Sequence, residues 1–164
     1  MVSESGAQLT AATPLGALYG LQTFLQLVQA TPSGFAVPVV TIRDQPRFAW
    51  RGLLIDVSRH FIPLDVLKRN LDGMAAVKMN VFHWHLSDNQ GFRIESKKFP
   101  NLQQLGSDDL YYTQDEAREL IAYARDCVPR AVSSGAKNSG ANTVFSVVPR
   151  TSRYWKRFSA KSTG

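Results

Sequence analysis

The chain has 164 residues, a single cysteine and a formal net charge of +6. This length allows one ordinary domain with a sizeable core, but a complete eight-stranded α/β barrel takes about 250 residues. The lone Cys127 excludes an internal disulfide framework and a metal site made of several thiolates.

The positive charge is concentrated at the C-terminal end. Residues 1–126 contain 12 basic and 13 acidic residues, whereas residues 127–164 contain seven basic residues and no acidic one. The body is therefore near neutral, and we predict no specific nucleic acid partner. Residues 1–6 lack the basic start and apolar core of a signal peptide, and no apolar run is long enough to predict a membrane span. We predict no membrane partner and leave the cellular location open.

The N-terminal part predicts one helix followed by a short extended segment. Residues 14–30 place Leu18, Leu21 and Leu25 on one face, as in an amphipathic helix that ends before Pro32. Residues 35–42 resemble a strand interrupted by a proline, and residues 44–46 form a turn. We interpret residues 1–45 as the C-terminal remnant of a small α+β domain.

Two apolar runs farther along predict buried strands at residues 53–57 and 79–86. Between them, Pro63 predicts the start of a helix whose apolar residues recur at helical spacing. Residues 87–109 form a long polar connection, and loops of that length are usually functional. A capping box at residues 113–116 then begins a second helix. This alternation predicts an α/β fold with parallel strands.

The pattern changes after Asp126. Of the last 38 residues, 15 are Ser, Thr, Asn or Gly, and neither helical nor strand periodicity persists. A third strand is expected near this point, and residues 144–148 are the one short candidate beyond it. We interpret residues 127–164 as a divergent basic tail that is disordered.

Charged residues follow both predicted strands, at Arg59 and Asp88. Because the carboxyl ends of parallel strands meet at one edge of a sheet, we expect these two side chains to lie close together. The Arg59 guanidinium suits sugar hydroxyls or a carboxylate, and the alternative is a structural salt bridge to Asp88. Asp88 can orient a histidine, and its alternative is an Asx-turn that starts the loop.

Other polar residues near these strands have weaker claims to function. Asp56 lies inside an apolar run, so it needs a buried partner. His83 and His85 share one face of a strand, which is a possible spacing for a metal pair. Without a clear third ligand, packing or hydrogen bonding is favoured for both and for His60, and we predict no metal site. Arg93 is assigned to a solvated loop.

Several catalytic signatures are absent from the sequence. It has no glycine-rich phosphate loop, no G-x-S-x-G elbow and no adjacent acid pair at a strand end. The adjacent acids at residues 108–109 and 115–116 lie in a polar loop and at a helix cap. Solvated carboxylates of this kind lack the apolar surroundings that a general acid needs.

Residues 51–60 (RGLLIDVSRH) and 78–93 (KMNVFHWHLSDNQGFR) closely resemble glycoside hydrolase family 20, the β-N-acetylhexosaminidases. The resemblance extends over about residues 14–126. Residues 16–27 (GALYGLQTFLQL) resemble the segment that leads into the family's catalytic (β/α)8 barrel, and residues 112–126 resemble its second barrel helix. The resemblance implies a partial TIM barrel, with its first two βα units in residues 46–126.

The family resemblance also implies a reaction and roles for two residues. It implies release of terminal β-linked N-acetylglucosamine or N-acetylgalactosamine with retention, in which the substrate's own acetamide oxygen is the nucleophile. Arg59 matches the arginine that binds hydroxyls of the terminal sugar, and Asp88 matches an aspartate that supports the acid/base machinery through a histidine. The partner is thus a carbohydrate, and neither cofactor nor metal is implied.

The sequence departs from the family pattern in two places. The family's catalytic Asp-Glu pair follows the fourth strand, and no such pair occurs here. The third strand's Pro-Gly-His motif is also replaced, because Cys127 is followed by VPRAVSS. We therefore expect a truncated chain that is inactive alone. The alternative is a non-catalytic sugar-binding or polyanion-binding fragment.

Overall fold

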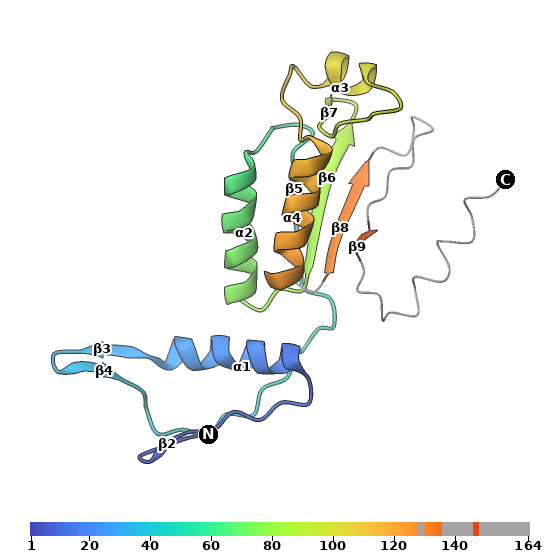
Figure 1. Ribbon diagram of the computed structural model, residues 1–164. Coiled ribbons are helices and arrows are strands. Elements are labelled where there is room, and N and C mark those ends of the chain that lie inside the picture. Colours follow the sequence, from blue (N-terminus) through green and yellow to red (C-terminus); the bar gives the residue numbers. More distant parts are fainter. Residues whose placement is uncertain (128–129, 136–145, 148–164) are drawn as a thin grey trace. The chain divides into compact units, whose positions relative to one another are not determined.

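The computed structural model describes residues 1–127, 130–135 and 146–147 (Figure 1). They fall into two units. The first comprises residues 1–49 and 76–78, and the second comprises residues 50–75 and the described residues from 79 onward. No helix among the described residues is both long enough and apolar enough to cross a membrane.

The first unit contains one helix and two short antiparallel hairpins. Thr13 caps the helix, since its hydroxyl accepts the backbone N–H of Gly16 at 3.0 Å, and Pro14 occupies the first turn. The helix begins and ends close to the predicted bounds. The elements are β1 (Val2–Ser3), β2 (Gly6–Ala7), α1 (Pro14–Leu27), β3 (Gln29–Thr31) and β4 (Gly34–Ala36), with β1 paired to β2 and β3 to β4.

The apolar face of α1 is solvent-exposed in this unit. Leu18, Leu21 and Leu25 are 52%, 48% and 60% exposed, respectively. The sequence pattern thus predicted the helix correctly, although none of its residues is buried among the described residues. Helical periodicity identifies the face that an amphipathic helix can bury, but it does not supply the surface that covers it.

The second unit is built on a sheet whose three long strands are parallel. The strand order is β5-β6-β8-β9, and β7 pairs with the end of β6. β5, β6 and β8 run parallel, whereas β7 and β9 are antiparallel to their neighbours. The elements are β5 (Gly52–Asp56), α2 (Leu64–Ala76), β6 (Val81–Asp88), β7 (Gly91–Phe92), α3 (Asn101–Gly106), α4 (Gln114–Cys127), β8 (Arg130–Gly135) and β9 (Ser146–Val147).

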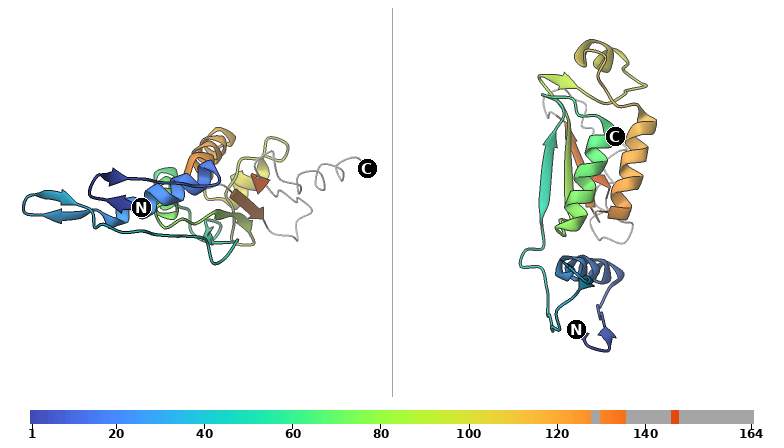
Figure 2. Two further views of the ribbon diagram at one scale, coloured as in Figure 1. Left: turned by 90° about the horizontal axis from the view of Figure 1, so that it is seen from below. Right: turned by 90° about the vertical axis from the view of Figure 1, so that its left-hand side faces the viewer.

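The two long helices, α2 and α4, lie side by side and pack on the same face of this sheet (Figure 2). Alternate side chains of β6 point into that core, as the period of a strand requires. The buried residues of the core include Leu67, Leu71 and Met74 from α2, Phe82, Trp84 and Leu86 from β6, and Leu120 and Ala124 from α4. The apolar face predicted for the helix after Pro63 is therefore confirmed as a buried face.

The intervening residues of β5 and β6 point to the opposite face of the sheet. Leu54 is paired with His83, and Asp56 is paired with His85, across the two parallel strands. The Leu54 side chain is 56% exposed on this face. Asp56, His83 and His85 therefore share one side of the sheet.

The predicted capping box at the start of α4 is confirmed. The Thr113 hydroxyl accepts the backbone N–H of Glu116 at 3.2 Å, and the Glu116 carboxylate accepts the backbone N–H of Thr113 at 2.8 Å. This reciprocal pairing satisfies two backbone N–H groups that a helix start otherwise leaves without partners.

Two sequence-based expectations differ from the structure. The connection at residues 87–109 is not structureless, because it contains β7 and α3. The tail is not wholly irregular either. Arg130–Gly135 forms β8 beside β6, where a third strand was expected, and Ser146–Val147, inside the candidate at residues 144–148, pairs with β8. Strand pairing uses backbone groups offered by a neighbour, which a side-chain pattern does not reveal. The other residues of the predicted tail from 128 onward lie outside the described residues.

Candidate functional site

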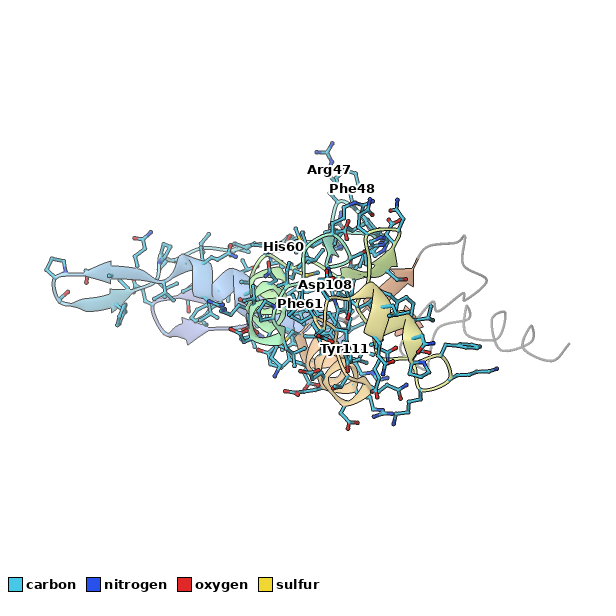
Figure 3. All side chains as sticks on the ribbon, turned by 90° about the horizontal axis from the view of Figure 1, so that it is seen from above. Arg47, Phe48, His60, Phe61, Asp108 and Tyr111 are labelled. Carbon is cyan, nitrogen blue, oxygen red and sulfur yellow. The ribbon has the colours of Figure 1, made fainter. Side chains whose placement is uncertain are left out.

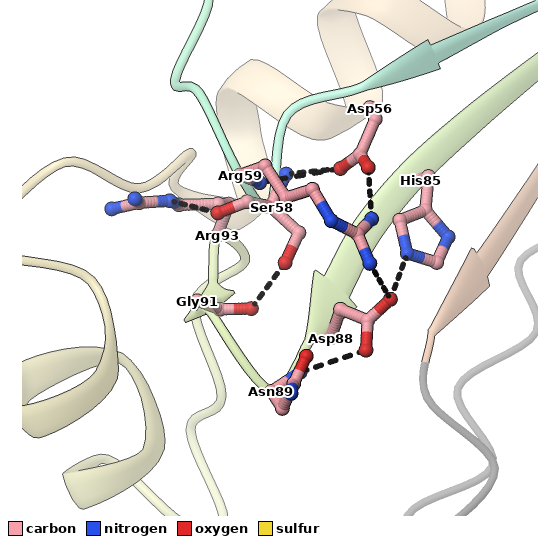
Figure 4. A network of polar contacts seen from close by, with 8 residues as sticks. All are labelled: Asp56, Ser58, Arg59, His85, Asp88, Asn89, Gly91 and Arg93. Carbon is pink, nitrogen blue, oxygen red and sulfur yellow. Dashed lines mark hydrogen bonds and ion pairs between the residues drawn. The ribbon is translucent and has the colours of Figure 1, made fainter.

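The Arg59 guanidinium lies just beyond the C-terminal end of β5 and bridges two carboxylates (Figure 4). Its Nη1 pairs with Asp56, and its Nη2 lies 3.1 Å from Asp88 Oδ2. The same Asp56 side chain accepts the backbone N–H groups of Ser58 at 3.0 Å and Arg59 at 3.2 Å. Asp56 therefore has the partners that its place in an apolar run required.

Asp88 closes the other side of this network at the end of β6. Its Oδ2 lies 3.0 Å from His85 Nε2, and its Oδ1 accepts the backbone N–H of Asn89 at 2.8 Å. The carboxylate thus contacts a histidine. Its bond to the N–H of the next residue is not the Asx-turn of the alternative interpretation, because an Asx-turn uses the N–H two residues on. The salt bridge between Arg59 and Asp88 was the alternative for Arg59, and it brings the two predicted site residues together.

The charges of this network stabilise one another. For Asp56, burial raises the pKa, but hydrogen bonds from the Arg59 side chain and backbone outweigh it and lower the pKa overall. The backbone N–H of Asn89, followed by the His85 ring, lowers the pKa of Asp88. Hydrogen bonding and charge from Asp56 raise the pKa of Arg59. At neutral pH the site therefore presents a guanidinium held between two carboxylates.

In this arrangement the Arg59 guanidinium remains accessible to a ligand. Its side chain is 52% exposed, and a guanidinium carries five N–H donors in a planar fork. Among the described residues, the two carboxylates engage its Nη1 and Nη2 groups. A fork that is fixed in orientation and open to solvent suits neighbouring hydroxyls or a carboxylate.

The histidines show no arrangement for metal binding. His83 and His85 lie on the same face with ring centroids 6.2 Å apart. Burial, followed by the charge of His85, lowers the pKa of His83, so that its ring is neutral at neutral pH. Within the described part of the chain, no group of three or more His, Cys, Asp or Glu side chains could hold a metal ion. His60 is exposed after β5, as Figure 3 shows from above.

The adjacent acid pairs lie in solvated or capping positions. Asp108 and Asp109 are exposed in the loop after α3, and both have positive φ angles of 51° and 60°. Asp115 is paired with Arg118, and Glu116 belongs to the capping box. Both sets thus have the solvated or capping environments that the sequence predicted.

Three further residues of the network were not identified from the sequence. Ser58, Gly91 and Arg93 are buried and lie to one side of the Arg59–Asp88 pair (Figure 4). The assignment of Arg93 to a solvated loop is wrong, because the residue is only 6% exposed. Its position between Phe92 and Ile94, two apolar residues, was the one available signal. Its hydrogen-bond partners are distant in sequence, so the segment alone could not reveal them.

Comparison with known families gives a match along most of the chain. The family model described as "Glycosyl hydrolase family 20, catalytic domain" matches residues 48–130, which includes both predicted site residues. The family model described as "Glycosyl hydrolase family 20, domain 2" matches residues 1–45.

Curated relatives are similar over about three quarters of this chain. A beta-hexosaminidase of Porphyromonas gingivalis is 39% identical over 139 residues, which cover 75% of this chain and 18% of the relative. The human beta-hexosaminidase subunit beta is 46% identical over 128 residues, which cover 76% of this chain and 23% of the relative. The chain therefore spans about a fifth of the length of these relatives.

Solved structures give the same result. A chitobiase of Flavobacterium johnsoniae is 56% identical with a TM-score of 0.68, over 73% of this chain and 18% of that one. An exo-β-N-acetylglucosaminidase of Vibrio harveyi, solved with N-acetylglucosamine, is 30% identical with a TM-score of 0.69, over 81% of this chain and 24% of that one.

Proposed function

The chain belongs to glycosyl hydrolase family 20, and we propose that it forms the sugar-binding side of a β-N-acetylhexosaminidase site. In this proposal Arg59 binds hydroxyls of a terminal β-linked N-acetylhexosamine. Asp88 supports the acid/base machinery through His85. The observation that carries the proposal is the hydrogen-bonded series Arg59–Asp88–His85 at the carboxyl ends of two neighbouring parallel strands.

The TIM barrel is the family fold, and we propose that β5, β6 and β8 are the first strands of such a barrel. Their parallel order with α2 and α4 on one face is what supports this assignment. We further propose that residues 1–45 are the end of an α+β domain and that residues 46–126 begin the catalytic domain. The match of two family models on either side of residue 46 supports this division.

The proposed substrate is a carbohydrate that ends in N-acetylglucosamine or N-acetylgalactosamine. The exposed, bidentate donor set of Arg59 supports hydroxyl binding, and the solved Vibrio harveyi relative contains N-acetylglucosamine. The proposed reaction retains configuration, and the substrate's acetamide oxygen attacks the anomeric carbon. This chemistry requires neither metal nor cofactor, and we propose none.

We propose that this chain does not hydrolyse the substrate by itself. The reaction needs one carboxylate to orient the acetamide and another to act as general acid and then base. The adjacent acid pairs of the chain lie instead at an exposed loop and a helix cap. General acid/base assistance contributes about a hundredfold to ten-thousandfold in rate. Without these two carboxylates, turnover is therefore expected to be lower by at least about a hundredfold.

Two measurements on the full 164-residue chain test the proposal. A chromogenic N-acetylglucosaminide assay is expected to show no turnover above background, and any turnover that Arg59→Ala abolishes would contradict the inactivity. Titration calorimetry with N-acetylglucosamine is expected to show weak binding that Arg59→Ala removes. Arg69→Ala is the matched control, because Arg69 is an exposed α2 residue paired locally with Asp65. Equal affinities for wild type and Arg59→Ala would rule out the proposed sugar contact.

A further inference from the structure

We infer that Arg93 is a positioning residue: with Ser58 and Gly91 it forms a buried clasp that fixes the separation between Arg59 and Asp88. The three clasp residues lie beside the Arg59–Asp88 pair and link the loop after β5 to the hairpin formed by β6 and β7 (Figure 4). The consequence for sugar binding rests on the proposed function, whereas the geometric effect does not.

The clasp is held by directional hydrogen bonds. Arg93 donates from Nε to the Ser58 carbonyl at 3.4 Å, and from Nη1 to the carbonyls of Ser107 and Leu110, the latter at 3.2 Å. Ser58 is fully buried, and its hydroxyl donates to the Gly91 carbonyl at 2.9 Å. The Arg93 guanidinium therefore connects its own segment to two others, the loop after β5 and the turn at residues 107–110.

The clasp contacts the immediate neighbours of both site residues. Ser58 directly precedes Arg59, and Gly91 is the register partner of Asp88 in the β6–β7 hairpin. A displacement of Ser58 relative to Gly91 therefore changes the distance across which Arg59 reaches Asp88. The clasp is closely packed at Gly91, since a Cβ added there would lie 2.6 Å from the Ser58 carbonyl oxygen and 2.9 Å from Arg93 Nε.

Arg93 also fixes the turn at residues 107–110. The backbone N–H of Leu110 donates to the Ser107 carbonyl at 2.9 Å, and the two central residues, Asp108 and Asp109, both have positive φ angles. Positive φ at both central residues is typical of a type I′ turn, which most residues other than Gly, Asn and Asp disfavour. The guanidinium binds the carbonyls at both ends of the turn and so stabilises it.

The chemistry of the clasp favours positioning over simple core filling. Burial of a guanidinium against neutral carbonyls incurs a desolvation penalty, and an apolar side chain of similar volume would avoid it. A hydrogen-bonded fork, however, specifies where its acceptors lie, whereas apolar packing tolerates sliding. The arrangement places this specificity beside the two residues whose spacing the proposed function depends on.

The test compares Arg93→Met with Leu120→Val in the full chain. Arg93→Met removes all three hydrogen bonds, whereas Leu120→Val perturbs the core of α4 and leaves the clasp intact. The first readout is the pKa of the Asp88 carboxyl, followed by carbon-13 NMR. The Asn89 backbone N–H lowers this pKa most and the His85 ring next, and the Arg59 charge also lowers it, so that a longer distance between Arg59 and Asp88 raises the pKa. The second readout is the affinity for N-acetylglucosamine.

We expect Arg93→Met to raise the pKa of Asp88 toward its ordinary value and to weaken sugar binding on the order of tenfold. Leu120→Val should lower stability but change neither readout. A folded Arg93→Met chain with the wild-type Asp88 titration and affinity would overturn the inference. If Arg93→Met does not fold, Ser58→Ala tests the clasp with the same two readouts, since this variant removes only the hydrogen bond to Gly91.

The two proposals fail in different ways. If wild type does not bind N-acetylglucosamine, the proposed sugar contact is wrong, but a raised pKa of Asp88 in Arg93→Met still supports the clasp. If wild type binds the sugar and the clasp variants leave both readouts unchanged, the clasp inference is wrong and the proposed function stands.

Discussion

Replacement of Gly91 by alanine should destabilise the chain for a purely steric reason. The added Cβ would lie 2.6 Å from the Ser58 carbonyl oxygen, whereas ordinary van der Waals contacts begin near 3.4 Å. The added Cβ and the Ser58 carbonyl oxygen would thus be about 0.8 Å too close, and this oxygen is a backbone atom. Neither can rotate away, so the β6–β7 hairpin must separate from the loop after β5.

The expected loss of stability follows from two contributions. Overpacking of a filled site costs about 1–3 kcal/mol. Separation also breaks the hydrogen bond from the Ser58 hydroxyl to the Gly91 carbonyl, which contributes about 1 kcal/mol. Gly91→Ala should therefore lower the free energy of unfolding by about 2–4 kcal/mol. This is a large part of the roughly 5–15 kcal/mol that is typical of a domain.

Urea unfolding, followed by far-ultraviolet circular dichroism, measures this difference from the midpoint and slope. Gly73→Ala is the matched control, because Gly73 lies inside α2 and a Cβ added there would meet nothing within 4 Å. Alanine should stabilise that helix position by about 0.5–1 kcal/mol. Wild-type stability in Gly91→Ala would refute the reasoning, as would equal destabilisation by both replacements.

Two further predictions concern the helix cap and the response to pH. Thr113→Ala should lower the free energy of unfolding by about 1 kcal/mol because it removes the cap of α4, and Thr113→Ser should retain stability in the same urea assay. Because the folded state lowers the pKa of His83 below its ordinary value of 6.5, the unfolded state binds a proton first as the pH falls. The free energy of unfolding should therefore be highest above pH 6.5 and decline below it. Urea midpoints measured from about pH 8 to pH 5 should show this decline in wild type, and His83→Gln should remove it. An unchanged decline in His83→Gln would assign the effect to other groups.

The parts of the fold that the sequence predicted are those determined by local pattern. The apolar run at residues 53–57 indicated β5, the proline at residue 63 indicated the start of α2, and the Thr113–Glu116 pair indicated the start of α4. Parallel neighbours then required Arg59 and Asp88 to be close together, and the structure confirms it. Each inference used a periodicity or a cap that a few adjacent residues carry.

The parts that the sequence did not predict depend on contacts distant along the chain. Arg93 is buried because the carbonyls of residues 58, 107 and 110 converge on it, and no segment of one element contains that information. The tail from residue 127 was interpreted as disordered, although a third strand was expected near its start and residues 144–148 were a candidate. β8 and β9 form at these two places through backbone pairing. Tertiary context overrode local composition in both cases.

The contacts that position the site are supplied from within residues 56–110. Asp56 holds Arg59 from the same turn, His85 holds Asp88 from the same strand, and the clasp connects the two. Within the described residues, these contacts therefore pre-position the Arg59 guanidinium that we propose binds the sugar. Binding and hydrolysis should accordingly be separable in this chain, with N-acetylglucosamine bound and the chromogenic substrate left intact. Loss of binding together with an intact Arg59–Asp88 pair would instead show that sugar recognition needs groups outside this network.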